Sequence, residues 1–258
     1  MNTIKLCGGL GNQLFQYAFG RVQKENGIEV EYDVSWFNGK NAQKPLRTYA
    51  LDKFTIDVPF IKERIYRKTI IESGFNPSLL QKDGFNFHGY WQYPDYYTNV
   101  LPILKSEIHV RQEYYTKEFL RLRTEILLKE NTVSIHVRRG DYLQLPDFPV
   151  LPLGYYQEAL KRVEGDVYIF SDDMDWCSHN FKGVQFVHLN EYLDFELMKL
   201  CKHNILSRSS FGWWAAYLNS NPNQIVVVPK QQIKCRVRKE AEKKNGVEVF
   251  DPKEWITL

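Results

Sequence analysis

Two adjacent arginines carry the clearest chemical signal in this sequence. Arg138 and Arg139 follow a short run of β-branched and apolar residues at 133–137, and Gly140 and Asp141 come next. Such a run is typical of a buried strand, and open α/β sheets place ligand sites at the carboxyl ends of their strands. A guanidinium group pairs bidentately with phosphate oxygens and stays charged at any working pH. The pattern predicts a phosphate clamp. The alternative is a solvated loop in which Asp141 only pairs with one arginine.

Two more polar clusters follow predicted strands in the second half of the chain. Asp172 and Asp173 come after the apolar run 166–170, and Ser209 and Ser210 lie between a short strand and a helix. In a parallel sheet these strand ends line one crevice. Arginines suit phosphates, carboxylates suit ribose hydroxyls or a base amine, and a Ser-Ser turn at a helix N-terminus suits an anion. Together the clusters predict a nucleotide or nucleotide-sugar site.

The elements that must position these groups alternate along the chain. Strands followed by helices of ordinary length predict an α/β fold with a parallel, doubly wound sheet. With 258 residues the chain can form one large or two modest domains. A polar linker near residue 130 predicts a boundary there, with domains at 1–130 and 131–258.

A glycine-rich turn lies near the N-terminus. Residues 3–7 predict a strand, Gly-Gly-Leu-Gly-Asn-Gln follows at 8–13, and residues 14–24 predict a helix. This layout brings backbone N–H groups to a ligand. The spacing matches neither the dinucleotide-binding fingerprint nor a Walker loop. Asn12 lies where the helix should begin, so it is a candidate cap.

An aromatic segment occupies residues 85–97, where seven Phe, Tyr and Trp residues are interrupted by His88 and Gly89. Two interpretations stay open. The segment lines a sugar pocket, or Tyr90 and Trp91 pack the core between two domains.

Composition excludes several classes of protein. The net charge of +3 is too small to indicate nucleic-acid binding. No apolar run is long enough for a membrane span, and no signal peptide is recognisable. The cysteines are Cys7, Cys177, Cys201 and Cys235, and none is part of a C-x-x-C pair. We therefore expect reduced thiols and a cytoplasmic location.

A basic tail at 230–246 predicts a solvated helix face or, alternatively, weak peripheral binding to an anionic membrane surface.

Five segments resemble one known family. The stretch from His136 to Tyr142, HVRRGDY, resembles the first motif of the α-1,2-fucosyltransferases, the family-11 glycosyltransferases. Similar family segments match residues 8–18, 89–92, 170–173 and 209–215, in the family's order. The resemblance implies a GT-B fold, in which two Rossmann-like domains with parallel sheets face a central cleft. It also implies GDP-β-L-fucose as donor, inversion to an α-fucoside, and no cofactor or obligatory metal.

The resemblance also implies roles for individual residues. The first arginine of the motif, Arg138, would reach the diphosphate, and His136 and Asp141 would complete the catalytic motif. Asn12 would face the donor across the cleft. The other expected donor-binding residues are Arg139, Asp172, Asp173, Ser209, Ser210 and Phe211. The expected acceptor-binding residues are His88, Tyr90 and Trp91.

The sequence departs from the family pattern at two positions, where many members have Asn and Ser and this chain has Arg208 and Gly212. Arg208 would add a phosphate contact or point to solvent. The general base stays open among Asp33, His88 and Asp141, and a dissociative route with little base assistance is the alternative.

The implied reaction is transfer of fucose to a galactose-ended glycan in bacterial surface polysaccharide synthesis, with an acceptor that could be lipid-linked. The alternative functions are a GDP-sugar transferase of different donor or linkage, and a nucleotide-sugar-binding protein without activity.

Overall fold

The computed structural model describes residues 1–38, 47–61, 66–148, 150–230 and 251–258. Compactness divides these described residues into two units, the first within 1–109 together with 251–252 and the second within 110–230 together with 253–258. Residues 110–130, which the sequence analysis assigned to the first domain, group with the second unit. Of the predicted basic tail, all but Lys230 lies outside the described residues.

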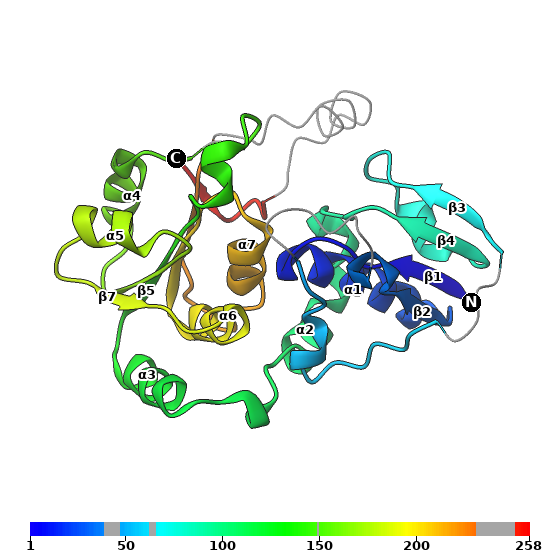
Figure 1. Cartoon of the computed structure of the whole chain (residues 1–258), viewed down its shortest axis with the longest axis horizontal. Coiled ribbons are helices and arrows are strands. Elements are labelled where there is room, and N and C mark those ends of the chain that lie inside the picture. The colour runs from blue at the N-terminus through cyan, green and yellow to red at the C-terminus, as the bar shows by residue number, and fades with distance from the viewer. Residues whose placement is uncertain (39–46, 62–65, 149, 231–250) are drawn as a thin grey trace. The chain divides into compact units, whose positions relative to one another are not determined.

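The first unit is built on a parallel four-stranded sheet with the order β2-β1-β4-β3 (Figure 1). Its strands are β1 (Asn2–Lys5), β2 (Val30–Asp33), β3 (Lys68–Ile71) and β4 (Phe85–His88). Its helices are α1 (Leu10–Glu25) and α2 (Leu101–Glu107). Strand β3 was missed by the sequence analysis, because its four residues are mostly exposed and show no burial signal.

One face of this sheet packs on α1. Ile4, Tyr32 and Phe87 are buried there, and the Phe19 ring of α1 lies 5.4 Å from the Phe87 ring. The Tyr32 hydroxyl donates to the carbonyl oxygen of Tyr17, also on α1. Side chains alternate between the two faces of a strand, so the neighbouring positions on β1, β2 and β4 face away from α1.

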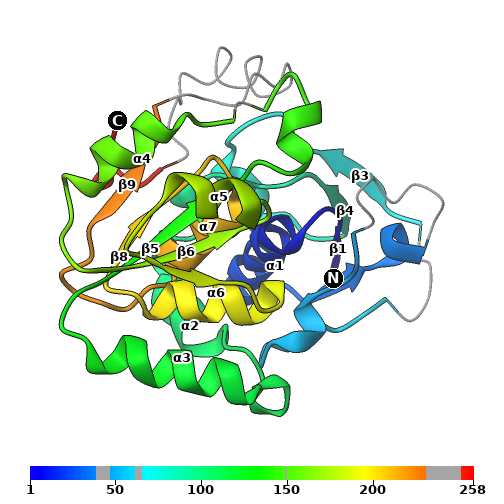
Figure 2. The ribbon, with the colours of Figure 1, turned by 60° about the vertical axis from the view of Figure 1, so that its left-hand side comes forward.

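The second unit contains a parallel six-stranded sheet with the order β10-β9-β8-β5-β6-β7. Its strands are β5 (Thr132–Val137), β6 (Asp166–Ser171), β7 (Gln185–Val187), β8 (His203–Ile205), β9 (Val226–Val228) and β10 (Ile256–Thr257). Its helices are α3 (Lys117–Leu128), α4 (Leu153–Leu160), α5 (Met174–Asn180), α6 (Glu191–Leu200) and α7 (Ser210–Tyr217). Figure 2 shows α3 alongside α6, a contact that keeps residues 117–128 in this unit.

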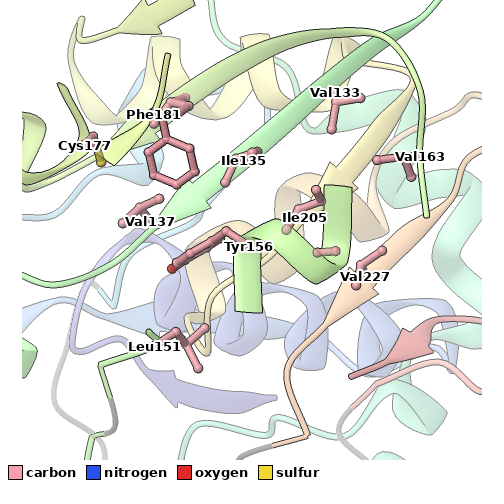
Figure 3. Close-up of a cluster of buried hydrophobic side chains, with 12 residues drawn as sticks. Val133, Ile135, Val137, Leu151, Tyr156, Val163, Cys177, Phe181, Ile205 and Val227 are labelled. Atoms are coloured by element: carbon pink, nitrogen blue, oxygen red, sulfur yellow. The ribbon is translucent and has the colours of Figure 1, made fainter. Parts of the chain in front are cut away.

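The central strand β5 is buried on both faces. Val133, Ile135 and Val137 join a hydrophobic cluster with side chains from α4 and α5, including Tyr156 and Cys177 (Figure 3). The alternate residues face the other layer of helices: the His136 ring lies 5.3 Å from the Phe211 ring of α7. Helices on both faces are the usual environment of a parallel sheet. The predicted α/β class with parallel sheets is confirmed.

One local prediction was wrong. Helix α1 begins at Leu10, with Gly9 as its N-cap, so Asn12 lies in the first turn and is not the cap. The glycines at 8 and 9 therefore form only the entry to the helix, and Gly8 has a positive φ of 80°. No described helix is both long enough and apolar enough to cross a membrane.

Candidate functional site

The sheet of the second unit brings the predicted arginines and aspartates together. Val137, the last residue of β5, pairs in register with Ser171, the last residue of β6. Both strands therefore end at the same level, and the residues after them form one cluster. No ligand is needed to explain this proximity, because parallel neighbouring strands place their carboxyl ends side by side.

Arg138 lies between two carboxylates. Its Nη2 donates to Asp141 Oδ1 at 2.6 Å, and its Nη1 is 3.1 Å from Asp172 Oδ2. The guanidinium carbon is 5.5 Å from the centre of the Tyr142 ring. The side chain of Arg138 is 20% exposed, so the group is fixed in direction but still reaches solvent.

Arg139 is fixed by different partners. Its backbone N–H donates to Asp172 Oδ1 at 2.9 Å, and its Nε donates to Asp173 Oδ2 at 3.0 Å. Its guanidinium lies 4.2 Å above the Trp176 ring on α5. The other oxygen of Asp173 accepts the Trp176 N–H at 3.0 Å and caps α5. Asp173 is therefore both a helix cap and an ion-pair partner.

Gly140 permits this close packing. A Cβ at position 140 would collide with the carboxylate of Asp172. A glycine is thus required for the turn to approach the neighbouring strand end.

His136 is buried beneath the cluster. Its Nδ1 lies 2.9 Å from Ser207 Oγ. Burial, and then the positive charge of Arg138, lower the pKa of His136 to about 3. The ring is therefore neutral at physiological pH, and with one exchangeable proton it can donate through only one ring nitrogen.

The turn after β8 completes the cluster. Ser209 caps α7 by accepting the Phe211 N–H at 3.4 Å. The Tyr142 hydroxyl donates to the carbonyl oxygen of Arg208 at 2.9 Å. The Arg208 side chain donates from Nη2 to the carbonyl oxygen of Pro229, beyond β9. The Arg208 side chain is therefore bonded to the backbone, whereas the sequence predicted that it would contact phosphate or point to solvent.

The charges of the cluster balance formally. Its arginines are Arg138, Arg139 and Arg208, and its carboxylates are Asp141, Asp172 and Asp173. A guanidinium has five N–H donors, and the contacts described for Arg138 and Arg139 use only some of them. The described residues contain no group of three or more His, Cys, Asp or Glu side chains arranged to bind a metal ion.

The candidate residues of the first unit fall in different environments. Asn12 Oδ1 accepts from Gln92 Nε2 at 2.9 Å, which connects the first turn of α1 to the aromatic segment. Trp91 has no exposed surface and stacks on Phe19 at 4.2 Å, so it packs the core of the unit. Tyr90 and His88 are exposed.

Three residues of the second-unit cluster were not singled out from the sequence. Tyr142 lies within the arginine motif, so its position was a usable signal. Trp176 and Ser207 gave no signal, because their contacts depend on how α5 and the turn after β8 pack on the sheet.

Comparison with known proteins identifies relatives of the whole chain. The family profile described as Glycosyl transferase family 11 matches residues 1–250. The O-antigen biosynthesis glycosyltransferase WbnK of Escherichia coli is 28% identical over 88% of this chain and 93% of its own length. An α-1,2-colitosyltransferase of Escherichia coli is 27% identical over 98% of this chain and 97% of its own length.

A mammalian relative and a solved structure extend the comparison. The galactoside 2-α-L-fucosyltransferase SEC1 of Bos taurus is 27% identical over 84% of this chain and 64% of its own length. The crystal structure of the NodZ α-1,6-fucosyltransferase soaked with GDP-fucose has a TM-score of 0.54 and 16% identity. This likeness covers 84% of this chain and 91% of NodZ, and it identifies the GT-B fold.

Proposed function

We propose that this chain, which belongs to glycosyl transferase family 11, transfers L-fucose from GDP-β-L-fucose to the 2-hydroxyl group of a galactose-ended glycan. The acceptor oxygen would attack the anomeric carbon from the side opposite the diphosphate, so the configuration inverts. Relatives named as 1,2-colitosyl and galactoside 2-fucosyl transferases support the donor class and the linkage.

The observation that carries the proposal is the placement of Arg138. It lies at the carboxyl end of the central strand of a parallel sheet, aimed by Asp141 and Asp172. When the bond between the sugar and the diphosphate breaks, the bonding electrons go to the phosphate oxygen. A preoriented guanidinium at that oxygen stabilises the developing charge, often the largest catalytic contribution.

The neighbouring residues would position Arg138 and the nucleotide. Asp141 and Asp172 fix its guanidinium, and Arg139 adds a second positive charge that is held by Asp173 and Trp176. The neutral His136 ring supports the strand end from below and keeps the Ser207 turn in place. Ser209, Ser210 and Phe211 would contribute hydroxyl or backbone contacts to phosphate at the start of α7.

The two units would divide the substrates between them. The second unit would bind the GDP moiety, and the first unit would bind the acceptor. The proton of the attacking hydroxyl group would go to a carboxylate or imidazole of the acceptor side or to the departing phosphate. Asp141 already accepts from Arg138, which makes it a weak candidate for this base, whereas Asp33 and His88 of the first unit stay candidates.

The relative WbnK, named for O-antigen biosynthesis, supports a role in surface polysaccharide assembly. The acceptor in that setting would be a glycan on a lipid carrier, and peripheral contact with the membrane would bring the protein to it.

A second donor is supported by one specific relative. The α-1,2-colitosyltransferase matches nearly the full length of both chains. Transfer of colitose by the same site is therefore the alternative reaction, and the linkage would be unchanged.

Calorimetric titration with GDP, UDP, GDP-fucose and GDP-mannose tests the donor, first without metal and then with Mg²⁺. Mass spectrometry of reactions with a panel of β-galactosides, supplied with GDP-fucose or a nucleotide-linked colitose, tests the transfer. We expect metal-independent binding of GDP and GDP-fucose and a product heavier by one deoxyhexose. A preference for UDP, or a strict need for metal, would contradict the proposal. Binding of GDP-sugar without transfer to any acceptor would favour the nucleotide-sugar-binding protein.

A further inference from the structure

The four-stranded sheet of the first unit has an unusual polar face. Thr69, Asn86, Thr3 and Glu31 lie in one row across all four strands, each paired in register with the next. Both faces of a parallel sheet are normally covered by helices and are apolar. Here Ile4, Tyr32 and Phe87, which face α1, are apolar and buried, but this row is polar on every strand.

An ion pair organises the row. Arg67 Nη1 donates to Glu31 Oε1 at 2.9 Å and to Thr3 Oγ1 at 2.6 Å. The side chains of Arg67 and Glu31 are only 10% and 11% exposed. Removing two charges from water is costly unless they are paired and hydrogen-bonded. The pair is satisfied, so it forms a fixed polar floor rather than a solvated surface contact.

This floor belongs to a pocket of about 520 Å³, which is within the usual range of small-ligand sites. Lys5, Asp33 and His88, which end β1, β2 and β4, also line it. Asp33 Oδ1 accepts the Ser35 N–H at 2.8 Å, which restrains the carboxylate. Tyr66, which is 99% exposed, is also a lining residue.

The charges in the pocket select the class of ligand. Lys5 and Arg67 are positive, and Glu31 and Asp33 are negative, so the formal charges cancel. His88 is an exposed residue, but local desolvation and then the positive charge of Lys5 lower the pKa of its ring, which favours the neutral form at pH 7. With no net charge, the pocket gives neither a phosphate nor a cation a net electrostatic attraction. A neutral molecule with many hydroxyl groups fits, because each hydroxyl group both donates and accepts.

We propose that this pocket binds a pyranose unit of the acceptor glycan. Carboxylate oxygens of Asp33 and Glu31 would accept from sugar hydroxyl groups, the Lys5 ammonium would donate to them, and the Tyr66 ring would cover an apolar face of the sugar. The role as an acceptor site rests on the proposed transferase function, whereas binding of a sugar does not.

The test is saturation-transfer NMR with the full chain and methyl glycosides of galactose, N-acetylgalactosamine, glucose and mannose. The variants Lys5→Ala and Asp33→Asn each remove one charged partner of the sugar. Lys68→Ala is the matched control, because Lys68 is an exposed lysine on β3 of the same sheet that does not line the pocket. Thermal unfolding confirms that each variant is folded; if Lys5→Ala is not, the isosteric Asp33→Asn carries the test.

We expect at least one glycoside to bind, with about tenfold weaker affinity in both pocket variants and no change in Lys68→Ala. Absence of binding by all four glycosides, or binding unchanged in Lys5→Ala and Asp33→Asn, would overturn the proposal. A parallel titration with GDP separates the two proposals. Failure of GDP to bind would reject the donor site while the sugar result stands, and GDP binding with no sugar binding would reject only the pocket.

Discussion

Gly212 and His136 pack so closely that a Cβ at position 212 would lie 2.7 Å from Nδ1 of the His136 ring. That nitrogen is also the one that lies 2.9 Å from Ser207 Oγ. Any side chain at position 212 must therefore displace the ring or break its contact with Ser207. Gly212 therefore leaves the space that the buried His136 ring occupies.

Replacing Gly212 by alanine should destabilise the second unit. Helix propensity favours alanine by about 1 kcal/mol, but overpacking in a close-packed core costs about 1–3 kcal/mol. We expect a lower midpoint in thermal unfolding. Gly154→Ala is the control, because position 154 in α4 has no heavy atom within 4 Å of an added Cβ. An unchanged or higher midpoint for Gly212→Ala would show that His136 moves without cost.

The buried His136 ring should make the second unit sensitive to acid. Its pKa is about 3 in the folded protein and about 6.5 in an unfolded chain. Between these values the unfolded state binds more protons, so stability falls as the pH is lowered. The contribution is at most about 1.4 kcal/mol per pH unit. The free energy of unfolding, measured with denaturant, should differ less between pH 5 and pH 7 for His136→Gln than for the parent chain. An equal difference in the two proteins would contradict the lowered pKa of His136.

Much of the fold was predictable from the sequence because the second unit alternates cleanly. The apolar runs at β5, β6 and β9, with helices between them, predicted parallel strands and a common crevice at their carboxyl ends. Strand β10 was missed, since two residues near the chain end carry no pattern. The start of α1 was placed four residues late, because glycines normally indicate a turn, whereas Gly11 lies inside the helix and is buried there.

The location of the candidate site was predictable, but which of its side chains bond to one another was not. The sequence placed Arg138 and Asp172 near one another because both follow neighbouring parallel strands. It could not show that Asp172 accepts from the backbone of Arg139 while Asp173 caps α5. Those contacts depend on side-chain rotamers and on the rotation of a helix about its axis, which local sequence does not determine.

The two roles of Asp173 can be separated by substitution. Asp173→Ala removes both the cap and the ion pair, and loss of a cap costs about 1 kcal/mol. Asp173→Asn keeps an oxygen for the Trp176 N–H, so stability should be nearly unchanged. It also replaces a charged partner of Arg139 by a neutral one, so GDP affinity should fall by about tenfold.

The control for this comparison is Asn190→Ala, which removes a cap of α6 that accepts the Leu193 N–H at 3.2 Å. It should lower the unfolding temperature as Asp173→Ala does and leave GDP affinity unchanged. If Asp173→Asn binds GDP as the parent chain does, Asp173 serves only the helix.

Arg138 gives the most direct test of the proposed chemistry. Arg138→Ala should lower the transfer rate by at least about 100-fold, the scale of one lost electrostatic donor at the developing charge. Arg138→Lys keeps the charge but loses the planar fork that bonds Asp141 and Asp172 together. Its rate should lie between those of Arg138→Ala and the parent chain. A rate for Arg138→Lys equal to that of the parent would mean that charge alone matters and that the orientation by the two aspartates does not.

Arg121 provides the matched control, because it also bridges two carboxylates. It pairs with Glu118 at 2.8 Å and Glu125 at 3.0 Å on α3, but its side chain is 52% exposed. Such surface pairs contribute at most about 1 kcal/mol, so Arg121→Ala should leave both transfer rate and GDP affinity unchanged. Near-normal turnover in Arg138→Ala would remove Arg138 from the mechanism. A loss in Arg121→Ala equal to that in Arg138→Ala would show that the effect reflects general destabilisation, because Arg121 lies outside the proposed site.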